Sequence, residues 1–310
     1  MRQSVIYEIP SLYRENFRIH GYTFGQGEKA LCVVGSLRGN EYQQIYTCSQ
    51  LVKALKRAEQ RGELCPGKEI LVLPSLNPYS MNVGKRFWPT DNTDINRMFP
   101  GYDQGETTQR IADGVFRQIS QYENGIQLAS FYMPGQFLPH VRMMRTGFEN
   151  VEKAKEFGLP HIILRDPRPY DTTTLNYNWQ IWNTNAYSIY TTTTASIDEV
   201  SADLAVRAML RFLAREEVLD HPVGGGCLSQ VWEDSALASV RPRYAGIFRP
   251  LCKPGDRITA GDPLAEILDP GEGGALERLL APCDGVVFFL HSDPMTYANT
   301  AVVKLLPERY

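Results

Sequence analysis

The sequence predicts an α/β domain over residues 1–222, followed by a smaller all-β module over residues 223–310. Two observations support this fold class. In the first part, apolar runs of strand length alternate with longer segments of helical period, which is typical of a mostly parallel sheet with helices on both faces. In the second part, short apolar runs are separated by turns rich in glycine and proline, which is typical of an all-β unit.

The first predicted strand lies at residues 30–35, where ALCVVG forms a short apolar run that ends on glycine. An amphipathic helix is predicted next, because apolar residues recur at spacings of three and four between Ile45 and Leu55. Residues 69–74 (EILVLP) predict a second buried strand. The domain therefore starts as strand, helix, strand.

A second helix is predicted after Glu106, where apolar residues recur every four positions as far as Ile119. Three further strands are predicted at residues 125–131, 161–165 and 187–194. The last helix is predicted to begin with Ser196 and Glu199 in a capping box and to run through Phe212. This order completes the alternating pattern of the α/β domain.

The hinge HPVGGG at residues 221–226 marks the expected boundary, which we place near residue 222. The turns that follow it are KPGD (253–256), AGD (260–262), DPGEGG (269–274) and APCDG (281–285). A short helical turn is expected at residues 275–280, and strands elsewhere.

Composition and charge disfavour several classes of protein. Thirty-two basic and 35 acidic residues give a net charge of −3, which argues against a dedicated binder of nucleic acid or anionic membranes. No apolar run approaches the roughly 20 residues needed to cross a bilayer, and no secretory signal is expected at the start. The six cysteines form no CxxC pair, so we expect reduced thiols in a cytoplasmic protein.

The long stretch between Ser75 and Gln104 has no regular pattern, and such a stretch inside a compact domain usually carries function. It contains NPYSMNVGKR at residues 77–86 and DINRMFPG at residues 94–101. These motifs resemble the loop of the succinylglutamate desuccinylase/aspartoacylase family, relatives of the zinc carboxypeptidases. That family has Asn-Pro, then an arginine, then Asp-Leu-Asn-Arg-x-Phe-Pro-Gly, from which this chain differs only at Ile95.

The resemblance extends over most of the chain. GSLRGNEYQ at residues 35–43 lies where the family has Gly-x-x-His-Gly-Asn-Glu, and LPHVR at residues 138–142 and the C-terminal module are also similar to the family. The resemblance implies a zinc-carboxypeptidase-like fold with a mixed, mostly parallel sheet. It also implies a C-terminal module of the barrel-sandwich kind.

By the same resemblance, Arg86, Asn96 and Arg97 hold the substrate carboxylate and polarise the scissile carbonyl. Arginine is suited to this role, because a guanidinium presents a planar fork of hydrogen-bond donors to a carboxylate. In the alternative interpretation these arginines are solvated, or Arg97 pairs with a structural acid. His140 and Arg142 are expected on a further loop, where they either border the same pocket or form an ordinary surface pair.

The metal ligands that the resemblance implies are only partly present. Glu41 retains the position of the glutamate ligand, but Arg38 and Ala129 occupy the positions of the two histidines. Alanine has no donor atom, and a protonated arginine has no lone pair to offer a cation. We therefore expect no zinc or other cofactor, and an ion pair of Arg38 with Glu41 in its place. A replacement site built on Glu41 and His140 is the alternative.

The catalytic glutamate of the family, in a Thr-x-Glu-x-Gly pattern, is also missing. Residues 190–195 read Tyr-Thr-Thr-Thr-Thr-Ala, so Thr192 or Thr193 stands at that position. A general acid or base for metal-bound water is therefore not expected.

Together these features predict a pseudoenzyme that binds a carboxylate-bearing amino acid or N-acyl amino acid in a cationic cleft formed by Arg38, Arg86 and Arg97. We expect a regulatory or partner subunit, in a homo-oligomer or in a hetero-oligomer with an active homologue, and neither nucleic acid nor membrane as a partner. The alternative is an amide hydrolase acting on N-acyl amino acids. It would be either zinc-dependent or metal-free, in the latter case with Glu41 as base and Arg86 stabilising the oxyanion.

Overall fold

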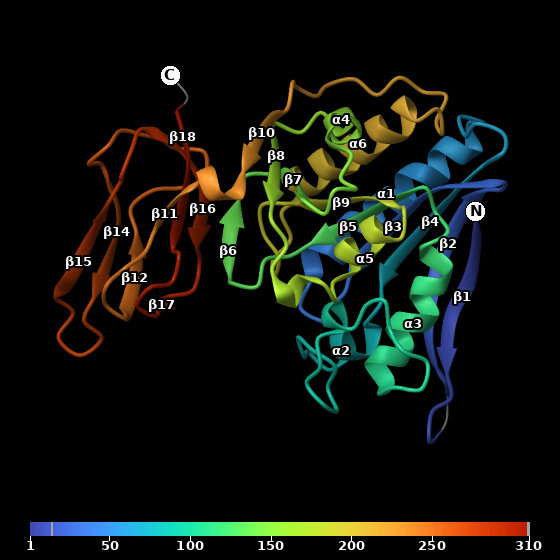
Figure 1. The fold of residues 1–310 in the computed structure, drawn as a ribbon, viewed down its shortest axis with the longest axis horizontal. Helices are drawn as coiled ribbons and strands as arrows, with labels where there is room; N and C mark the ends of the chain where they lie inside the picture. Colours follow the sequence, from blue (N-terminus) through green and yellow to red (C-terminus); the bar gives the residue numbers. More distant parts are fainter. Residues whose placement is uncertain (14, 309–310) are drawn as a thin grey trace. The chain divides into compact units, whose positions relative to one another are not determined.

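The computed structural model describes residues 1–13 and 15–308, which divide into two compact units. The first unit comprises residues 1–130 and 139–231, and the second comprises residues 131–138 and 232–310. Figure 1 shows the elements of both units.

The boundary differs from the one expected near residue 222. The division lies after Val231, inside β10 (Gln230–Glu233), whose pairing extends the large sheet past the hinge. The segment 131–138 also belongs to the second unit, since β6 (Gly135–Phe137) pairs antiparallel with β16 (Gly285–His291). A strand of three residues with a partner so far along the chain leaves no periodic signal in the sequence.

The first unit is built on a nine-stranded sheet in the order β1-β2-β4-β3-β5-β9-β7-β8-β10. Its strands before β10 are β1 (Arg2–Ile9), β2 (Phe17–Gly25), β3 (Glu28–Ser36), β4 (Lys68–Ser75), β5 (Asn124–Ala129), β7 (His140–Met144), β8 (His161–Arg165) and β9 (Asn185–Tyr190). The central strands β4, β3, β5 and β9 run parallel, whereas β1, β2 and β7 pair antiparallel with their neighbours β2, β4 and β9. The sheet is therefore mixed, with a parallel centre.

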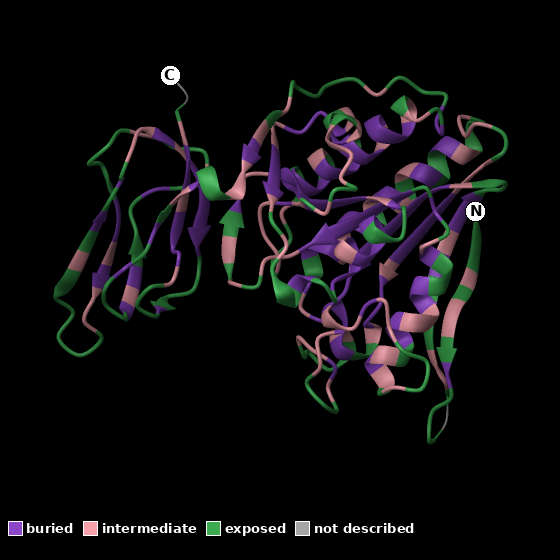
Figure 2. Ribbon diagram, in the orientation of Figure 1, coloured by how far each residue is buried: buried purple, intermediate pink, exposed green. Residues whose placement is uncertain are grey.

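Successive residues of a strand point to opposite faces of the sheet, and both faces of this sheet are covered. Leu31 and Val33 pack in the core under α1 (Tyr42–Gln60) and α6 (Glu199–Arg215). Cys32 and Val34 pack in the opposite core with α3 (Thr107–Ile119) and α5 (Leu175–Ile181). The central strands are consequently buried along most of their length (Figure 2).

The remaining helices of the first unit are short. They are α2 (Pro78–Asn82), α4 (Val151–Ala154) and the 3₁₀ turns η1 (Ile95–Arg97), η2 (Lys155–Phe157) and η3 (Pro169–Asp171). Two of them, α2 and η1, lie in the stretch between Ser75 and Gln104, which is therefore not wholly irregular. Among the described residues, no helix is long and apolar enough to span a membrane.

Two expectations about β9 and α6 are corrected. The strand ends at Tyr190, so the threonines at 191–194 lie in a loop and not on the strand. The helix begins at Glu199 with Asp198 as its N-cap, not with Ser196. The Asp198 carboxylate accepts a hydrogen bond of 3.2 Å from the backbone N–H of Val200, which satisfies one of the amides left open at a helix start.

Asp198→Ala is expected to lower the free energy of unfolding by about 1 kcal/mol, the usual cost of losing an N-cap. Ser196→Ala is the matched control, and it should leave stability within about 0.5 kcal/mol of the wild type because Ser196 lies outside the cap. Urea unfolding followed by circular dichroism measures both. A larger loss for Ser196→Ala would restore the capping box expected from the sequence.

The second unit contains two antiparallel sheets around its own core. One sheet has the order β11-β18-β16-β13 with β6 beside β16, and the other has the order β15-β14-β12-β17. These strands are β11 (Ala238–Val240), β12 (Gly246–Pro250), β13 (Arg257–Ile258), β14 (Pro263–Leu268), β15 (Ala275–Leu280), β17 (Met295–Thr296) and β18 (Val303–Pro307), and η4 (Asp234–Ala236) precedes them. The helical turn expected at 275–280 is wrong, because this segment is strand β15 paired with β14.

Candidate functional site

Polar side chains of the first unit gather where the parallel strands end. Arg38 and Glu41 lie in the turn between β3 and α1, and Ser130 directly follows β5. Asp94 joins them from the loop before η1, where it caps that turn. The carboxyl ends of parallel strands are the usual location of ligand sites in α/β folds.

Glu41 is the most enclosed member of this group, with 1% of its surface exposed. Its carboxylate accepts hydrogen bonds from the backbone N–H groups of Leu37 at 2.7 Å and Arg38 at 3.0 Å. It also accepts from Nη1 of Arg38 at 3.0 Å and from the hydroxyl of Ser130. Four donors therefore converge on one buried carboxylate.

Arg38 is held between two acids. Its Nη1 pairs with Glu41, and its Nη2 and Nε donate to Oδ2 of Asp94 at 2.8 and 3.2 Å. A further bond of 3.1 Å runs from Nη1 to the hydroxyl of Ser130. Burial opposes the charge of Arg38, but the carboxylates of Glu41 and Asp94 outweigh it and raise the pKa of Arg38 above its ordinary value. The guanidinium is therefore a permanent cation inside the site.

Arg86 lies beside this network. The backbone N–H of Gly39 donates to the carbonyl of Arg86 at 2.9 Å, which ties the loop after α2 to the turn that carries Arg38. Gly39 is required for this approach, because a Cβ atom there would lie 2.1 Å from the carbonyl oxygen of Lys85. The guanidinium of Arg86 lies 5.4 Å from the ring centre of Phe87.

The surroundings of Arg86 are unfavourable to its charge. Burial, and after it the neighbouring Arg38 cation, lower the pKa of Arg86 below its ordinary value, although Glu41 and Asp94 oppose this shift. An anion bound next to Arg86 would offset both effects.

Arg97 has a different environment from the one that the sequence suggested. Its Nη1 lies 3.6 Å from the carboxylate of Asp171 and donates to the carbonyl of Tyr170 at 2.7 Å, and its guanidinium lies over the Tyr170 ring. The ion pair with a structural acid, which was the alternative interpretation, is therefore present. Of the three arginines expected to form a cationic cleft, Arg38 and Arg97 are therefore paired with carboxylates.

Asn96 also has a supporting position. The side-chain oxygen of Asn96 accepts a hydrogen bond from the backbone N–H of Leu175 at 3.1 Å. The backbone N–H of Asn96 donates to the Asp94 carboxylate at 3.0 Å. These bonds connect η1 to the start of α5. Asn96 thus holds Asp94 in the orientation in which it reaches Arg38.

His140 and Arg142 are not a surface pair on a loop. Both lie on β7 and are buried, with exposed fractions of 0% and 8%. The imidazole of His140 stacks on the ring of Tyr190 with a centroid distance of 4.7 Å, and the guanidinium of Arg142 lies 5.2 Å from the same ring. The register of β7 on β9 brings them there, since His140 is opposite Tyr190.

The threonine loop after β9 carries no carboxylate, as the sequence shows. The hydroxyl of Thr191 donates to the carbonyl of Thr193, whose own hydroxyl donates to the carbonyl of Ser196 at 2.7 Å. The backbone N–H of Thr192 donates to the hydroxyl of Ser201 at 3.3 Å. The hydroxyls of Thr191 and Thr193 thus hold the loop together.

Comparisons with known proteins bear on this site. The model of the succinylglutamate desuccinylase/aspartoacylase catalytic domain matches residues 27–166. The N-alpha-acetyl-L-2,4-diaminobutyric acid deacetylase of Halomonas elongata is 24% identical over 278 residues, which are 85% of this chain and 77% of that protein. Residues 27–166 of this chain thus match the catalytic domain of the succinylglutamate desuccinylase/aspartoacylase family.

Solved structures have the same fold as this chain. A succinylglutamate desuccinylase from Silicibacter sp. TM1040 superposes with a TM-score of 0.82 at 15% identity, covering 98% of this chain and 94% of that one. The product-bound ectoine utilization protein of Ruegeria pomeroyi superposes with a TM-score of 0.79 at 16% identity, over 98% and 94% of the two chains. At these identities the likeness concerns the fold.

The zinc that the family resemblance implies does not fit the residues that this chain has at the ligand positions. Arg38 lies between Glu41 and Asp94, and it presents only donors to them. Ala129 ends β5 with a side chain that cannot bind a metal. Within residues 1–13 and 15–308, no group of three His, Cys, Asp or Glu side chains could hold a metal ion, so the alternative site on Glu41 and His140 gains no third ligand.

Two residues of the site did not emerge from the sequence. Asp94 is part of the motif at 94–101, but its pairing with Arg38, 56 positions away, depends on the fold. Ser130 follows a strand and belongs to no motif. A search for polar residues directly after predicted strands could have found Ser130.

Proposed function

We propose that this protein is a metal-free pseudoenzyme that binds a carboxylate-bearing amino acid or N-acyl amino acid beside Arg86. The observation that carries the proposal is the buried Arg38, held by Glu41 and Asp94 at the position of the first histidine ligand of the family. A permanent cation at that position repels a divalent metal and engages the carboxylate that would otherwise bind it.

The binding part of the proposal depends on Arg86. The pKa of Arg86 is lowered by burial and by Arg38, so a ligand carboxylate would restore favourable surroundings to its guanidinium. Arginine meets a carboxylate through two parallel hydrogen bonds, which gives both affinity and orientation.

The class of ligand comes from the relatives. The Halomonas elongata relative is named as a deacetylase of N-alpha-acetyl-L-2,4-diaminobutyric acid, which carries a carboxylate and an acylated amine on one carbon. N-acyl amino acids have the same two groups, and free amino acids have the carboxylate beside an unacylated amine. A role as a regulatory or partner subunit, in the cytoplasm and in an oligomer, would use this binding without turnover.

A second candidate function is hydrolysis of N-acyl amino acids, with zinc or without it. The retained Glu41 and the contact of the Ser130 hydroxyl with its carboxylate favour this candidate. Against it, the Glu41 carboxylate already accepts hydrogen bonds from Leu37, Arg38 and Ser130. A carboxylate that already accepts four hydrogen bonds has few lone-pair positions left for a water molecule.

The metal part of the proposal predicts that protein purified without chelator contains far less than one zinc ion per chain. Elemental analysis after dialysis measures the zinc content directly. A stoichiometric zinc ion that survives dialysis would contradict the proposal and favour the hydrolase.

The catalytic part is tested by acyl release from a panel of N-acyl amino acids, with and without added Zn²⁺. We expect no release in either condition, while the same compounds shift the thermal unfolding temperature. Turnover that is abolished by Glu41→Gln would favour the hydrolase.

A further inference from the structure

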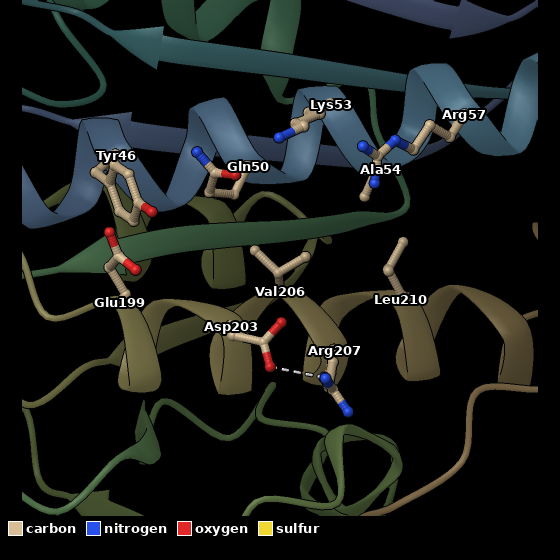
Figure 3. Close-up of a pocket in the computed structure, with 10 residues that line it drawn as sticks. All are labelled: Tyr46, Gln50, Lys53, Ala54, Arg57, Glu199, Asp203, Val206, Arg207 and Leu210. Carbon is tan, nitrogen blue, oxygen red and sulfur yellow. Dashed lines mark ion pairs between the residues drawn. The ribbon is translucent and has the colours of Figure 1, made fainter.

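A groove between α1 and α6 lies outside the site described above. It has a volume of about 320 Å³, which is at the lower end of the range for small-molecule pockets. Figure 3 shows its lining, which consists of Tyr46, Gln50, Lys53, Ala54 and Arg57 from α1 and Glu199, Asp203, Val206, Arg207 and Leu210 from α6.

The charges of the groove are distributed unevenly along its length. Tyr46 and Glu199 lie at one end, and Arg57 and Leu210 lie at the other (Figure 3). The eleven residue steps from Tyr46 to Arg57 correspond to about 16 Å of helix. One end of the groove is therefore acidic, and Lys53 and Arg57 make its middle and far end basic.

Several of these charges are available to a ligand. Asp203 and Arg207 neutralise each other at 2.7 Å on α6. Glu199, Lys53 and Arg57 form no ion pair with any other described residue. Because all three side chains are exposed, they can reorient towards a ligand without a large desolvation cost.

The apolar lining and the rigidity of the two helices complete the site. Val206 is 6% exposed and packs in the core that α1 and α6 share. The amide of Gln43 donates to the carbonyl of Asp198 at 2.9 Å, and its oxygen accepts from the Asp198 N–H at 2.9 Å. The helices are thus fixed to one another at their N-terminal ends, so the groove exists before any ligand binds.

We propose that this groove binds a linear zwitterion, such as an ω-amino acid or a short peptide. Its ammonium group would lie at Glu199, its carboxylate at Lys53 and Arg57, and its methylene chain along Val206 and Leu210. Since exposed ion pairs are individually weak, affinity requires both charged ends and the apolar chain between them. Arg86 is not among the residues that line this groove.

Isothermal titration calorimetry of the full chain at low ionic strength tests this proposal with 6-aminohexanoic acid. Hexanoic acid and hexylamine are the comparison ligands, since each keeps the chain and one charged end. We expect the zwitterion to bind about tenfold more tightly than either, which corresponds to about 1.4 kcal/mol. No binding of the zwitterion, or equal affinity for hexanoic acid, would overturn the proposal.

Variants assign the binding to the groove. Glu199→Gln and Arg57→Gln should each weaken binding of 6-aminohexanoic acid about fivefold or more. Lys56→Gln, which removes an exposed charge of α1 outside the groove, should leave the affinity unchanged. Binding that is lost in Arg86→Met but kept in Glu199→Gln would place the zwitterion in the other pocket and contradict the proposal.

Discussion

Replacing Arg38 by methionine is expected to lower the free energy of unfolding by about 3–5 kcal/mol, because removal of one partner leaves buried charges uncompensated. Glu41 and Asp94 both pair with Arg38, and Glu41 is 1% exposed. Methionine keeps much of the apolar volume, so the loss reports on charge and not on a cavity. Urea denaturation of wild type and variant at pH 7 measures it.

A triple variant provides the control. Adding Glu41→Gln and Asp94→Asn to Arg38→Met removes the two stranded carboxylates, and it should recover a large part of the lost stability. If Arg38→Met alone costs less than about 1 kcal/mol, Arg38 is solvated and does not replace the metal.

Arg86→Met is expected to weaken binding of N-acyl amino acids by about 30-fold or more, since truncating one partner of a desolvated charge pair costs at least about 2 kcal/mol. The folded state should lose little, because burial and Arg38 already disfavour the Arg86 charge. Calorimetric titration with an N-acyl amino acid that shifts the unfolding temperature gives both affinities.

Arg86→Lys is the matched variant for this prediction. Lysine keeps the charge but loses the planar fork, so we expect an affinity between those of wild type and Arg86→Met. Lys56→Met controls for the loss of a positive charge elsewhere. Equal affinities in wild type and Arg86→Met would remove Arg86 from the ligand site.

The parts of the fold that sequence periodicity predicts are those with a long apolar pattern. α1, α3 and the buried strands β3 and β4 lie where apolar spacing placed them. The hairpin of β1 and β2 was missed because much of β1 is exposed and its pattern does not alternate cleanly. α5 was missed for another reason, since it buries polar residues, among them Asn178, whose amide donates to the carbonyls of Phe99, Thr172 and Thr174.

In the site, contacts between residues close in sequence could be predicted, whereas contacts between residues far apart in sequence could not. The pairing of Arg38 with Glu41 could be predicted because the two residues lie three positions apart. The second acid, Asp94, and the partner of Arg97, Asp171, lie 56 and 74 positions from the arginines that they bind, so their contacts depend on the fold. His140 and Arg142 were placed on a loop because their strand is short and is identified only by its pairing with β8 and β9.

The position of Arg38 also bears on how this lineage can change. Arg38→His alone would leave Glu41 and Asp94 without their shared cation. Ala129→His alone would add one nitrogen ligand to a site that still holds a guanidinium. Each of these substitutions alone is thus unfavourable, and only the two together could provide the ligands whose binding of a metal would stabilise the protein. A zinc site built on histidines at positions 38 and 129 would therefore require both substitutions at once, because each alone is unfavourable.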